Sequence, residues 1–364
     1  MQDATTKSHG VMEGGGAYNL HARIPAGGGS LALPFLEQAL RCIALDGGNQ
    51  PVVIADYGSS QGKNSLAPMR AAIKALRERL GPDRPIVVVH VDQAANDFNT
   101  LFDVLHRDPD RYAQDDPNVF PSAIGRSFYE SVLPSDHVHL GWSSYAAVWL
   151  SRIPTVVPGH FVAVRSAGDV RAAFERQGAE DWKSFLSLRA RELRPGGRLV
   201  VVLPALDDEG KAGFEHLFDT ANATLADMVD EGAITADERS RMVLGAYPRR
   251  RRDLLEPFEQ DGQFQGLTVE HCDLSTVPDS AWADYAQDGN KEALVTRHAG
   301  FFRAVFAPSL ASALVGAGNG AGHAFADRLE DGLKRRLADR PAPLHSFVQT
   351  MVLAKQVLAK QDRG

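Results

Sequence analysis

The sequence has few of the features that mark secreted, metal-binding or membrane-spanning proteins. Its only cysteines, Cys42 and Cys272, stand far apart and neither belongs to a CxxC pair. That spacing argues against a disulfide framework or a zinc site and fits a reducing compartment. No apolar run reaches the roughly 18 residues that a membrane-spanning helix needs, and the N-terminal MQDATTKSHG lacks an apolar signal core. We therefore expect a soluble, cytoplasmic protein with no membrane span and no bound metal.

An excess of positive charge is also absent, since 39 Lys and Arg residues stand against 46 Asp and Glu residues. The formal net charge is −7 over 364 residues, with 44% hydrophobic and 23% charged residues, which is ordinary globular composition for one large domain or two. This balance argues against a nucleic-acid partner. The one basic run, residues 249–252, is short, and we interpret it as a solvated loop or helix end rather than a phosphate site.

Apolar runs alternate with helical patterns along most of the chain. Strands are predicted at residues 51–56, 85–92, 137–144, 197–206 and 267–274, and helices at 65–80, 96–108 and 181–197. Such alternation is typical of an α/β fold with a parallel, doubly wound sheet covered by helices on both faces.

Two regions depart from this alternation because they show helical patterning without a strand. They are residues 209–262 and the end of the chain, about 290–362. We expect a Rossmann-like core of residues 1–208 and 263–320. Residues 209–262 and the C-terminal helices to 364 would then form a helical cap over the ligand edge of the sheet.

The first strand leads into ADYGSSQGKNSL, residues 55–66, a glycine-containing turn without the GxGxxG dinucleotide pattern. Ligands of open parallel sheets bind beyond the carboxyl ends of the strands. Gly58 and Gly62 are candidates for positive φ, and Asp92, at the end of the second strand, is placed to accept hydrogen bonds from ribose hydroxyls. An acid there is also a common turn residue. The features together suggest a nucleoside ligand without a pyrophosphate, such as S-adenosylmethionine, and argue against a NAD-dependent dehydrogenase.

Several longer phrases carry a family resemblance. In chain order they are VMEGGGAYNLHARIP, ADYGSSQGKN, DQAANDFNTLF, GRSFYESVLP, WSSYAAVWLSRIP, FLSLRARELRPGGRLVV and LADMVDEGAI. In wording, order and spacing they resemble the plant SABATH carboxyl methyltransferases, which include salicylate, benzoate and theobromine enzymes, and their bacterial branch. The resemblance implies a class I methyltransferase fold, S-adenosylmethionine as cofactor, a small carboxylic acid as substrate and a homodimer.

The resemblance also implies site residues. Asp92 would bind the ribose hydroxyls, Gln93 would lie by the adenine, and Phe128 would stack on it. The complete implied cofactor set is Tyr18, Asp56, Gly58, Ser59, Asn64, Asp92, Gln93, Ser127, Phe128 and Tyr145. On the acceptor side, Trp149 would offer its indole N–H to the substrate carboxylate, Tyr145 would flank it, and Tyr247 would line the acyl or ring pocket.

One departure from the family pattern bears on the substrate. Pro25 stands where the family has a glutamine that helps to bind the carboxylate, and proline has no side-chain donor. His21, on the family's asparagine position, is a possible substitute. The predicted catalytic group is therefore Trp149, Tyr145 and His21.

The expected chemistry needs no general base, because a carboxylate with a pKa of about 4 to 5 is already ionised at neutral pH. Leu, Val, Phe and Ala dominate the predicted cap, and the chain has only 6 methionines. Together with Pro25, this favours a flexible aliphatic or fatty acid. Three alternatives stay open: an aromatic acid such as benzoate or salicylate, transfer to a ring nitrogen or hydroxyl, and a cofactor-binding protein without catalysis.

Overall fold

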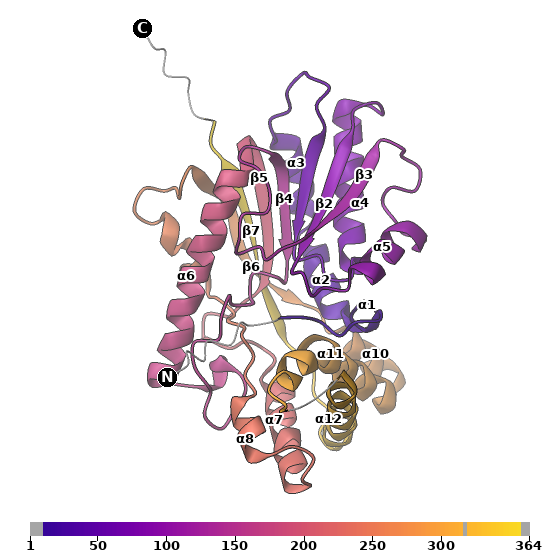
Figure 1. Ribbon diagram of the computed structural model, residues 1–364, viewed down its shortest axis with the longest axis vertical. Helices are drawn as coiled ribbons and strands as arrows, with labels where there is room; N and C mark the ends of the chain where they lie inside the picture. The colour runs from indigo at the N-terminus through magenta and orange to yellow at the C-terminus, as the bar shows by residue number, and fades with distance from the viewer. Residues whose placement is uncertain (1–9, 316–318, 358–364) are drawn as a thin grey trace.

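The computed structural model describes residues 10–315 and 319–357. Within them a seven-stranded sheet stands above a lobe of helices (Figure 1). The strand order is β3-β2-β1-β4-β5-β7-β6. The strands are β1 (Val52–Tyr57), β2 (Ile86–Asp92), β3 (Val119–Gly125), β4 (Val138–Ser144), β5 (Leu193–Pro204), β6 (Leu267–Val277) and β7 (Ser346–Lys355).

Strands β1 to β5 pair in parallel, whereas β7 runs antiparallel to both of its neighbours, β5 and β6. The predicted α/β sheet is thus confirmed, and every predicted strand is present. Strand β3 was not predicted, because Pro121 and Gly125 make its sequence look like a loop. It lies at an edge of the sheet, where a residue without an N–H donor is tolerated.

The end of the chain differs from its predicted helical structure. Strand β7 lies between β5 and β6, and nearly all of its residues are buried. A short apolar run buried on both faces cannot be distinguished from a buried helix by periodicity alone, which is why SFVQTMVLAK was misassigned. The predicted cap therefore does not continue through this segment, and residues 358–364 lie outside the described residues.

The helices cover both faces of the sheet and build the lobe below it. They are α1 (Ala17–His21), α2 (Arg23–Leu31), α3 (Leu33–Cys42), α4 (Lys63–Leu80), α5 (Phe98–Arg107), η1 (Ala163–Arg165), α6 (Gly168–Glu192), α7 (Glu215–Asp230), α8 (Ala236–Arg241), α9 (Arg251–Leu255), η2 (Glu256–Phe258), α10 (Ser280–Asp288), α11 (Lys291–Ala311) and α12 (Asn319–Asp339). The predicted helix at 181–197 corresponds to the second half of α6, which ends at Glu192. Strand β5 begins at the next residue, Leu193. None of the described helices is long and apolar enough to cross a bilayer.

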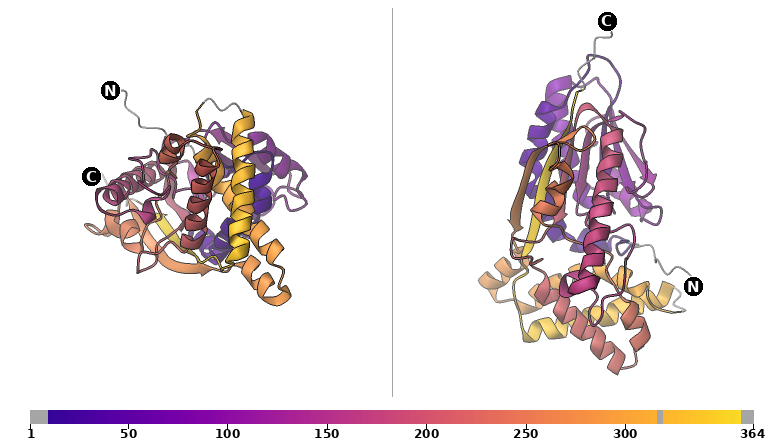
Figure 2. Two further views of the ribbon diagram at one scale, coloured as in Figure 1. Left: turned by 90° about the horizontal axis from the view of Figure 1, so that it is seen from below. Right: turned by 90° about the vertical axis from the view of Figure 1, so that its left-hand side faces the viewer.

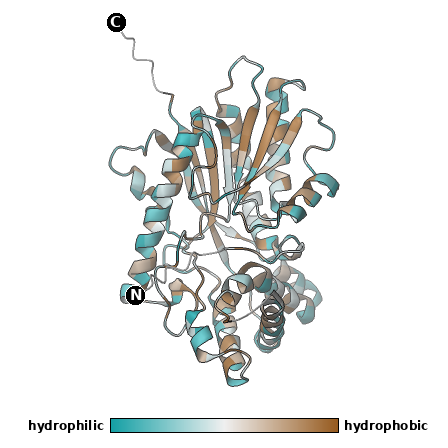
Figure 3. Ribbon diagram, in the orientation of Figure 1, coloured by the Kyte–Doolittle hydropathy of each residue, from teal (hydrophilic) through white to brown (hydrophobic). Residues whose placement is uncertain are grey.

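Alternate residues of β1 face two different cores, as the period of a strand requires. Val52 and Ile54 join the cluster that contains residues of α3 and α4, whereas Val53 and Ala55 join residues of α6. Figure 3 shows the resulting pattern, with apolar strands inside and polar outer faces on the helices. The sheet is therefore held from both sides, and its carboxyl edge is left to face the lobe.

The lobe has a core of its own, built mainly by α7, α11 and α12. Phe218 from α7, Phe302 from α11 and Leu329 from α12 belong to one buried cluster. Helix α11 therefore lies in the lobe, whereas the predicted boundary placed residues 263–320 in the sheet core. The right-hand view in Figure 2 shows the lobe at one end of the sheet.

Candidate active site

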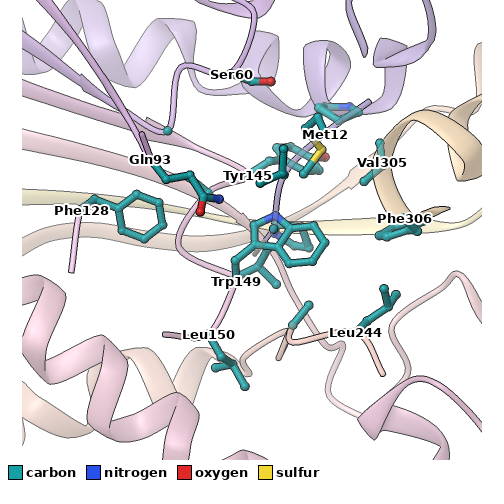
Figure 4. A pocket seen from close by; sticks show the side chains of 18 of the residues that line it. Met12, Ser60, Gln93, Phe128, Tyr145, Trp149, Leu150, Leu244, Val305 and Phe306 are labelled. Carbon is teal, nitrogen blue, oxygen red and sulfur yellow. The ribbon is translucent and has the colours of Figure 1, made fainter. Parts of the chain in front are cut away.

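A cavity of about 560 Å³ lies where the carboxyl edge of the sheet meets the lobe. The end of β2 and the segments that follow β1, β2 and β3 supply a half with many polar groups: Gly58, Ser60, Asp92, Gln93, Asn96, Ser127 and Phe128. The other half is apolar: Leu150, Val162, Val164, Phe214, Phe218, Leu244, Phe301, Val305 and Phe306. Figure 4 shows Trp149 and Tyr145 between Gln93 and Phe128 on one side and Val305 and Phe306 on the other.

The turn after β1 has the backbone geometry that its glycines suggested. Gly58 has φ of +91° and Gly62 has φ of +86°, so both predicted positive-φ positions are confirmed. The amides of Gly58 and Ser59 donate to the carbonyl of Val91, at 2.7 and 3.2 Å. A Cβ atom at Gly58 would lie 2.1 Å from the Cβ of Ala146, so this glycine lets the turn approach the segment after β4.

Asp92 lies at the carboxyl end of β2 and lines the cavity. Its carboxylate accepts hydrogen bonds from the amides of Ser60, at 2.7 Å, and Gln93, at 2.8 Å. Desolvation raises the pKa of Asp92 to about 6, against the lowering effect of these two bonds, and the charge of Asp56 adds to the rise. Further donors would therefore stabilise the charged form of this carboxylate.

Asp56 does not line the cavity, although the family resemblance included it in the cofactor-binding set. It is 2% exposed and accepts hydrogen bonds from Ser65 Oγ at 2.5 Å and His90 Nδ1 at 2.9 Å. The other ring nitrogen of His90, Nε2, lies 2.8 Å from the Tyr112 hydroxyl oxygen. This buried network stabilises the turn that follows β1.

Polar atoms of the same turn have no hydrogen-bond partner among the described residues. They are Ser59 Oγ, Ser60 Oγ and Gln61 Oε1. Of these residues only Ser60 lines the cavity. Ser59, which was predicted to bind the cofactor, does not line it. Buried polar atoms without partners are uncommon in native proteins, and an unpartnered oxygen at a cavity wall fits a polar ligand there.

Tyr18 and Asn64 form a pair at the other edge of the polar half. Tyr18 lines the cavity, and desolvation raises the pKa of its hydroxyl while a hydrogen bond with Asn64 acts in the opposite direction. Asn64 itself does not line the cavity, and its Nδ2 donates to the carbonyl of Ala22 at 3.4 Å. Asn64 therefore reaches the cavity only through Tyr18.

Tyr145 and Trp149 lie at the boundary between the two halves. Tyr145 has φ of +60°, a conformation that is uncommon for a bulky residue and that recurs at functional sites. Its amide donates to the carbonyl of Val202 at 2.7 Å, and desolvation raises the pKa of its hydroxyl. The indole of Trp149 lies 6.4 Å from the ring of Phe306, centroid to centroid. Both predicted residues thus line the cavity.

His21 does not line the cavity, so the substitute predicted for the missing glutamine is absent from its wall. The imidazole packs against Gly300 of α11, where an added Cβ would lie 2.6 Å from His21 Nδ1. Pro25 is buried and does line the cavity.

Tyr247 also points away from the cavity, although its neighbours Ala246 and Pro248 line it. Successive side chains of an extended segment alternate between faces, and this alternation puts Tyr247 on the α6 side. There its hydroxyl donates to Glu175 Oε1 at 3.3 Å, and desolvation raises its pKa to about 12. Tyr247 was predicted to line the acyl or ring pocket, but its side chain faces α6 and not the cavity.

Some cavity residues carried no distinct signal in the sequence. Met12 and the phenylalanines of α7 and α11 belong to apolar patterns that indicate only a buried helix face or segment. Arg126 is the cation among the described lining residues, and its Nε lies 3.7 Å from Glu130 Oε2. No group of His, Cys, Asp or Glu within the described ranges is arranged to hold a metal ion.

Comparison with known proteins gives one family over nearly the whole chain. Residues 6–355 match the family described as SAM dependent carboxyl methyltransferase. A relative from Fusarium sp, methyltransferase LUC1, is 30% identical over 253 residues, which span 68% of this chain and 66% of LUC1. Salicylate carboxymethyltransferase of Clarkia breweri is 27% identical over 273 residues, which span 72% of this chain and 73% of that enzyme.

The fold has a close counterpart among solved structures. The structure of loganic acid methyltransferase with SAH has a TM-score of 0.76 and 22% identity. The match covers 95% of this chain and 99% of the other. At this identity the likeness concerns the arrangement of sheet and helical lobe, and it places the chain among class I methyltransferase folds.

Proposed function

The chain belongs to the S-adenosylmethionine-dependent carboxyl methyltransferase family, and from this premise we propose that it forms methyl esters of small lipophilic carboxylic acids, with aliphatic acids favoured. The observation that carries the proposal is the cavity itself. One of its halves presents a carboxylate and polar turn atoms, the other is apolar, and Trp149 lies between them.

The polar half suits the nucleoside and amino-acid parts of S-adenosylmethionine. Asp92 would accept hydrogen bonds from the ribose hydroxyls, Phe128 would lie against the adenine, and Tyr18 and Ser60 would face the polar methionine end. The unpartnered Ser60 Oγ supports this fit. When bound, the cofactor supplies an electrophilic methyl group on a sulfonium centre.

On the acceptor side, Trp149 would orient a carboxylate by donating its indole N–H, without having to move a proton. The substrate carboxylate is ionised at neutral pH, so the residues around it need only align it and exclude water. Alignment alone can contribute roughly 7–11 kcal/mol in favourable cases. The apolar walls from α7 and α11 would remove water from the nucleophile.

The substrate class rests on the same walls. Phenylalanine, leucine and valine side chains make up most of the acceptor half, and none of Pro25, His21 and Tyr247 adds a polar group to it. An acid with an apolar body and no second polar group would leave no donor or acceptor unpaired there. We therefore favour an acid whose body is wholly apolar, with aliphatic acids first.

A panel of acids with labelled S-adenosylmethionine tests this proposal. We expect base-labile label in the esters of medium-length aliphatic acids such as octanoate, with a lower KM than for benzoate or salicylate. Transfer to salicylate or benzoate but not to octanoate would overturn the aliphatic assignment. A product that resists mild base would instead indicate transfer to nitrogen or hydroxyl.

The raised pKa of Asp92 predicts a pH dependence of cofactor binding. Only the ionised carboxylate can accept from both ribose hydroxyls, so the affinity for S-adenosylhomocysteine should fall as the pH drops through about 6. The Asp92→Asn variant should bind more weakly at neutral pH and lose most of this dependence. Calorimetric titration between about pH 5 and pH 8, where native proteins are usually most stable, measures the affinity and its pH dependence.

The same carboxyl group affects the unliganded protein in the opposite sense. Because its pKa is higher in the folded protein than in the unfolded chain, its contribution to stability is present at low pH and lost as the pH rises through about 6.

An affinity for S-adenosylhomocysteine that stayed constant through this range in the unsubstituted protein would contradict the assignment of Asp92 to the ribose.

A further inference from the structure

The loop after β3 touches both halves of the cavity. Phe128 and Tyr129 both line it, and their rings lie 4.8 Å apart, centroid to centroid. Phe128 belongs to the cofactor half, whereas the Tyr129 hydroxyl donates a hydrogen bond of 2.6 Å to the main-chain carbonyl of Trp149. Adjacent residues of one loop therefore contact the proposed cofactor and acceptor sites.

This loop is fixed from behind by a buried ion pair on α6. Arg189 Nη2 lies 2.9 Å from Glu192 Oε1, and both side chains are almost completely buried. Arg189 Nη1 donates to the carbonyl of Phe128 at 2.8 Å, and Glu192 accepts from the amides of Val132, at 2.9 Å, and Leu133. One buried ion pair thus holds the backbone of the loop, and the Tyr129 side chain extends from the loop toward Trp149.

Several hydrogen bonds hold the segment that carries Trp149. The amide of Tyr247 donates to the carbonyl of Val148 at 2.9 Å, and the amide of Leu150 donates to the carbonyl of Gly245 at 2.7 Å. Besides the bond from Tyr129, Arg249 Nη1 donates to the carbonyl of Ala147 at 2.6 Å. On the other side, Asp181 accepts from the amide of Ser151 at 2.8 Å and from its hydroxyl at 2.6 Å. Of these hydrogen bonds, only the one from Tyr129 comes from the loop that also carries Phe128.

Arg249 departs from the interpretation of residues 249–252 as a solvated loop or helix end, whereas Arg251 and Arg252 are exposed at the start of α9. The Arg249 side chain is 1% exposed, and its guanidinium also donates to the carbonyl of Gly178 at 2.8 Å. The charge is thus used inside the molecule, where the carbonyls of α6 and of the Trp149 segment satisfy its donors.

We propose that Tyr129 is a positioning residue, whose hydroxyl fixes the backbone of Trp149 to the cofactor-side loop and so couples acid binding to cofactor binding. The inference rests on the proposed function of Trp149. The physical basis is that a half-buried carbonyl that loses its donor is free to move or must find another partner. Any shift of the Trp149 carbonyl also shifts the indole that receives the acid.

The test compares Tyr129→Phe with Tyr247→Phe. Both variants remove one tyrosine hydroxyl that donates a hydrogen bond, but Tyr247 donates to Glu175 outside the cavity. In Tyr129→Phe we expect the KM for octanoate to rise roughly five- to tenfold, the effect of one lost hydrogen bond. The affinity for S-adenosylhomocysteine alone should change by less than about twofold, within the scatter of such contributions. Tyr247→Phe should leave both quantities unchanged.

Coupling is measured directly by titrating S-adenosylhomocysteine with and without saturating octanoate. The unsubstituted protein should bind it more tightly with the acid present, and Tyr129→Phe should lose most of that difference. An unchanged KM with unchanged coupling would overturn the inference. So would a parallel loss of cofactor affinity, acid affinity and melting temperature, which indicates a purely structural role.

Hydrogen exchange separates this inference from the proposed function. If the unsubstituted protein methylates no carboxylic acid, the proposed function fails. The inference is then decided by amide exchange in residues 146–151 of the unliganded protein. Faster exchange there in Tyr129→Phe than in Tyr247→Phe supports the positioning role, and equal exchange rejects it.

Discussion

Trp149→Phe lowers kcat/KM for the acid by roughly 10- to 150-fold, the loss expected when a hydrogen bond to a charged group, worth about 1.5–3 kcal/mol, is removed. Phenylalanine keeps a flat apolar ring beside Phe306, whose ring lies 6.4 Å from the indole. Most of the packing therefore survives, and the indole N–H is the main group removed. Trp149→Ala should lose more, because it also opens space in the cavity wall.

Steady-state kinetics with each substrate varied separately measure this effect. The affinity for S-adenosylhomocysteine should be nearly unchanged in Trp149→Phe, because the proposed cofactor contacts of Asp92 and Phe128 are left intact. Val148→Ala is a suitable control, since Val148 also lines the cavity but offers no donor. A full kcat/KM for octanoate in Trp149→Phe would show that another group binds the carboxylate.

The second large effect is expected from Gly58→Ala, which should destabilise the protein by roughly 2–5 kcal/mol and abolish cofactor binding at ordinary concentrations. Part of the cost is the φ of +91°, which costs a residue with a Cβ roughly 1–2 kcal/mol. The rest is overpacking, typically about 1–3 kcal/mol, because the new Cβ would lie 2.1 Å from the Cβ of Ala146. Relieving that clash moves the turn or the segment that leads to Trp149.

Gly289→Ala is the matched control for this change. Gly289 ends α10 with φ of 67° and ψ of 11°, and an added Cβ would have nothing within 4 Å. It should therefore cost only the conformational penalty, about 1 kcal/mol. Chemical denaturation and calorimetry with S-adenosylhomocysteine measure both variants. Equal losses of stability would mean that the contact between Gly58 and Ala146 has no special role.

Local sequence patterns were sufficient for five of the seven strands and for the edge of the sheet that lines the cavity. The β-branched run of β1, the glycines of its turn and the acid at the end of β2 act over short distances along the chain. Parallel pairing then aligns Asp56 with His90 and Tyr57 with Val91, so the ends of β1 and β2 must meet at one edge. The predicted positive φ at Gly58 and Gly62 and the cavity position of Asp92 followed from these local rules.

The same patterns failed where a strand depends on distant neighbours. Nothing within SFVQTMVLAK distinguishes a strand from a buried helix, and β7 becomes a strand because β5 and β6 offer it hydrogen bonds on both sides. The family resemblance likewise gave positions to Asp56, His21 and Tyr247 but not their directions. Asp56 turns toward His90, His21 toward Gly300, and Tyr247 toward Glu175.

By itself, therefore, the sequence determined the α/β class, the family and the edge of the sheet where we propose that the methyl donor binds, because strand periodicity, turn glycines and ordered motifs are local properties. The tertiary structure alone decided which side chains face the acceptor and how Trp149 is held. The bond from Tyr129 to Trp149 spans 20 residues of chain and the bond from Arg249 to Ala147 spans 102. Contacts of that separation exist only after the sheet and the helical lobe have folded together.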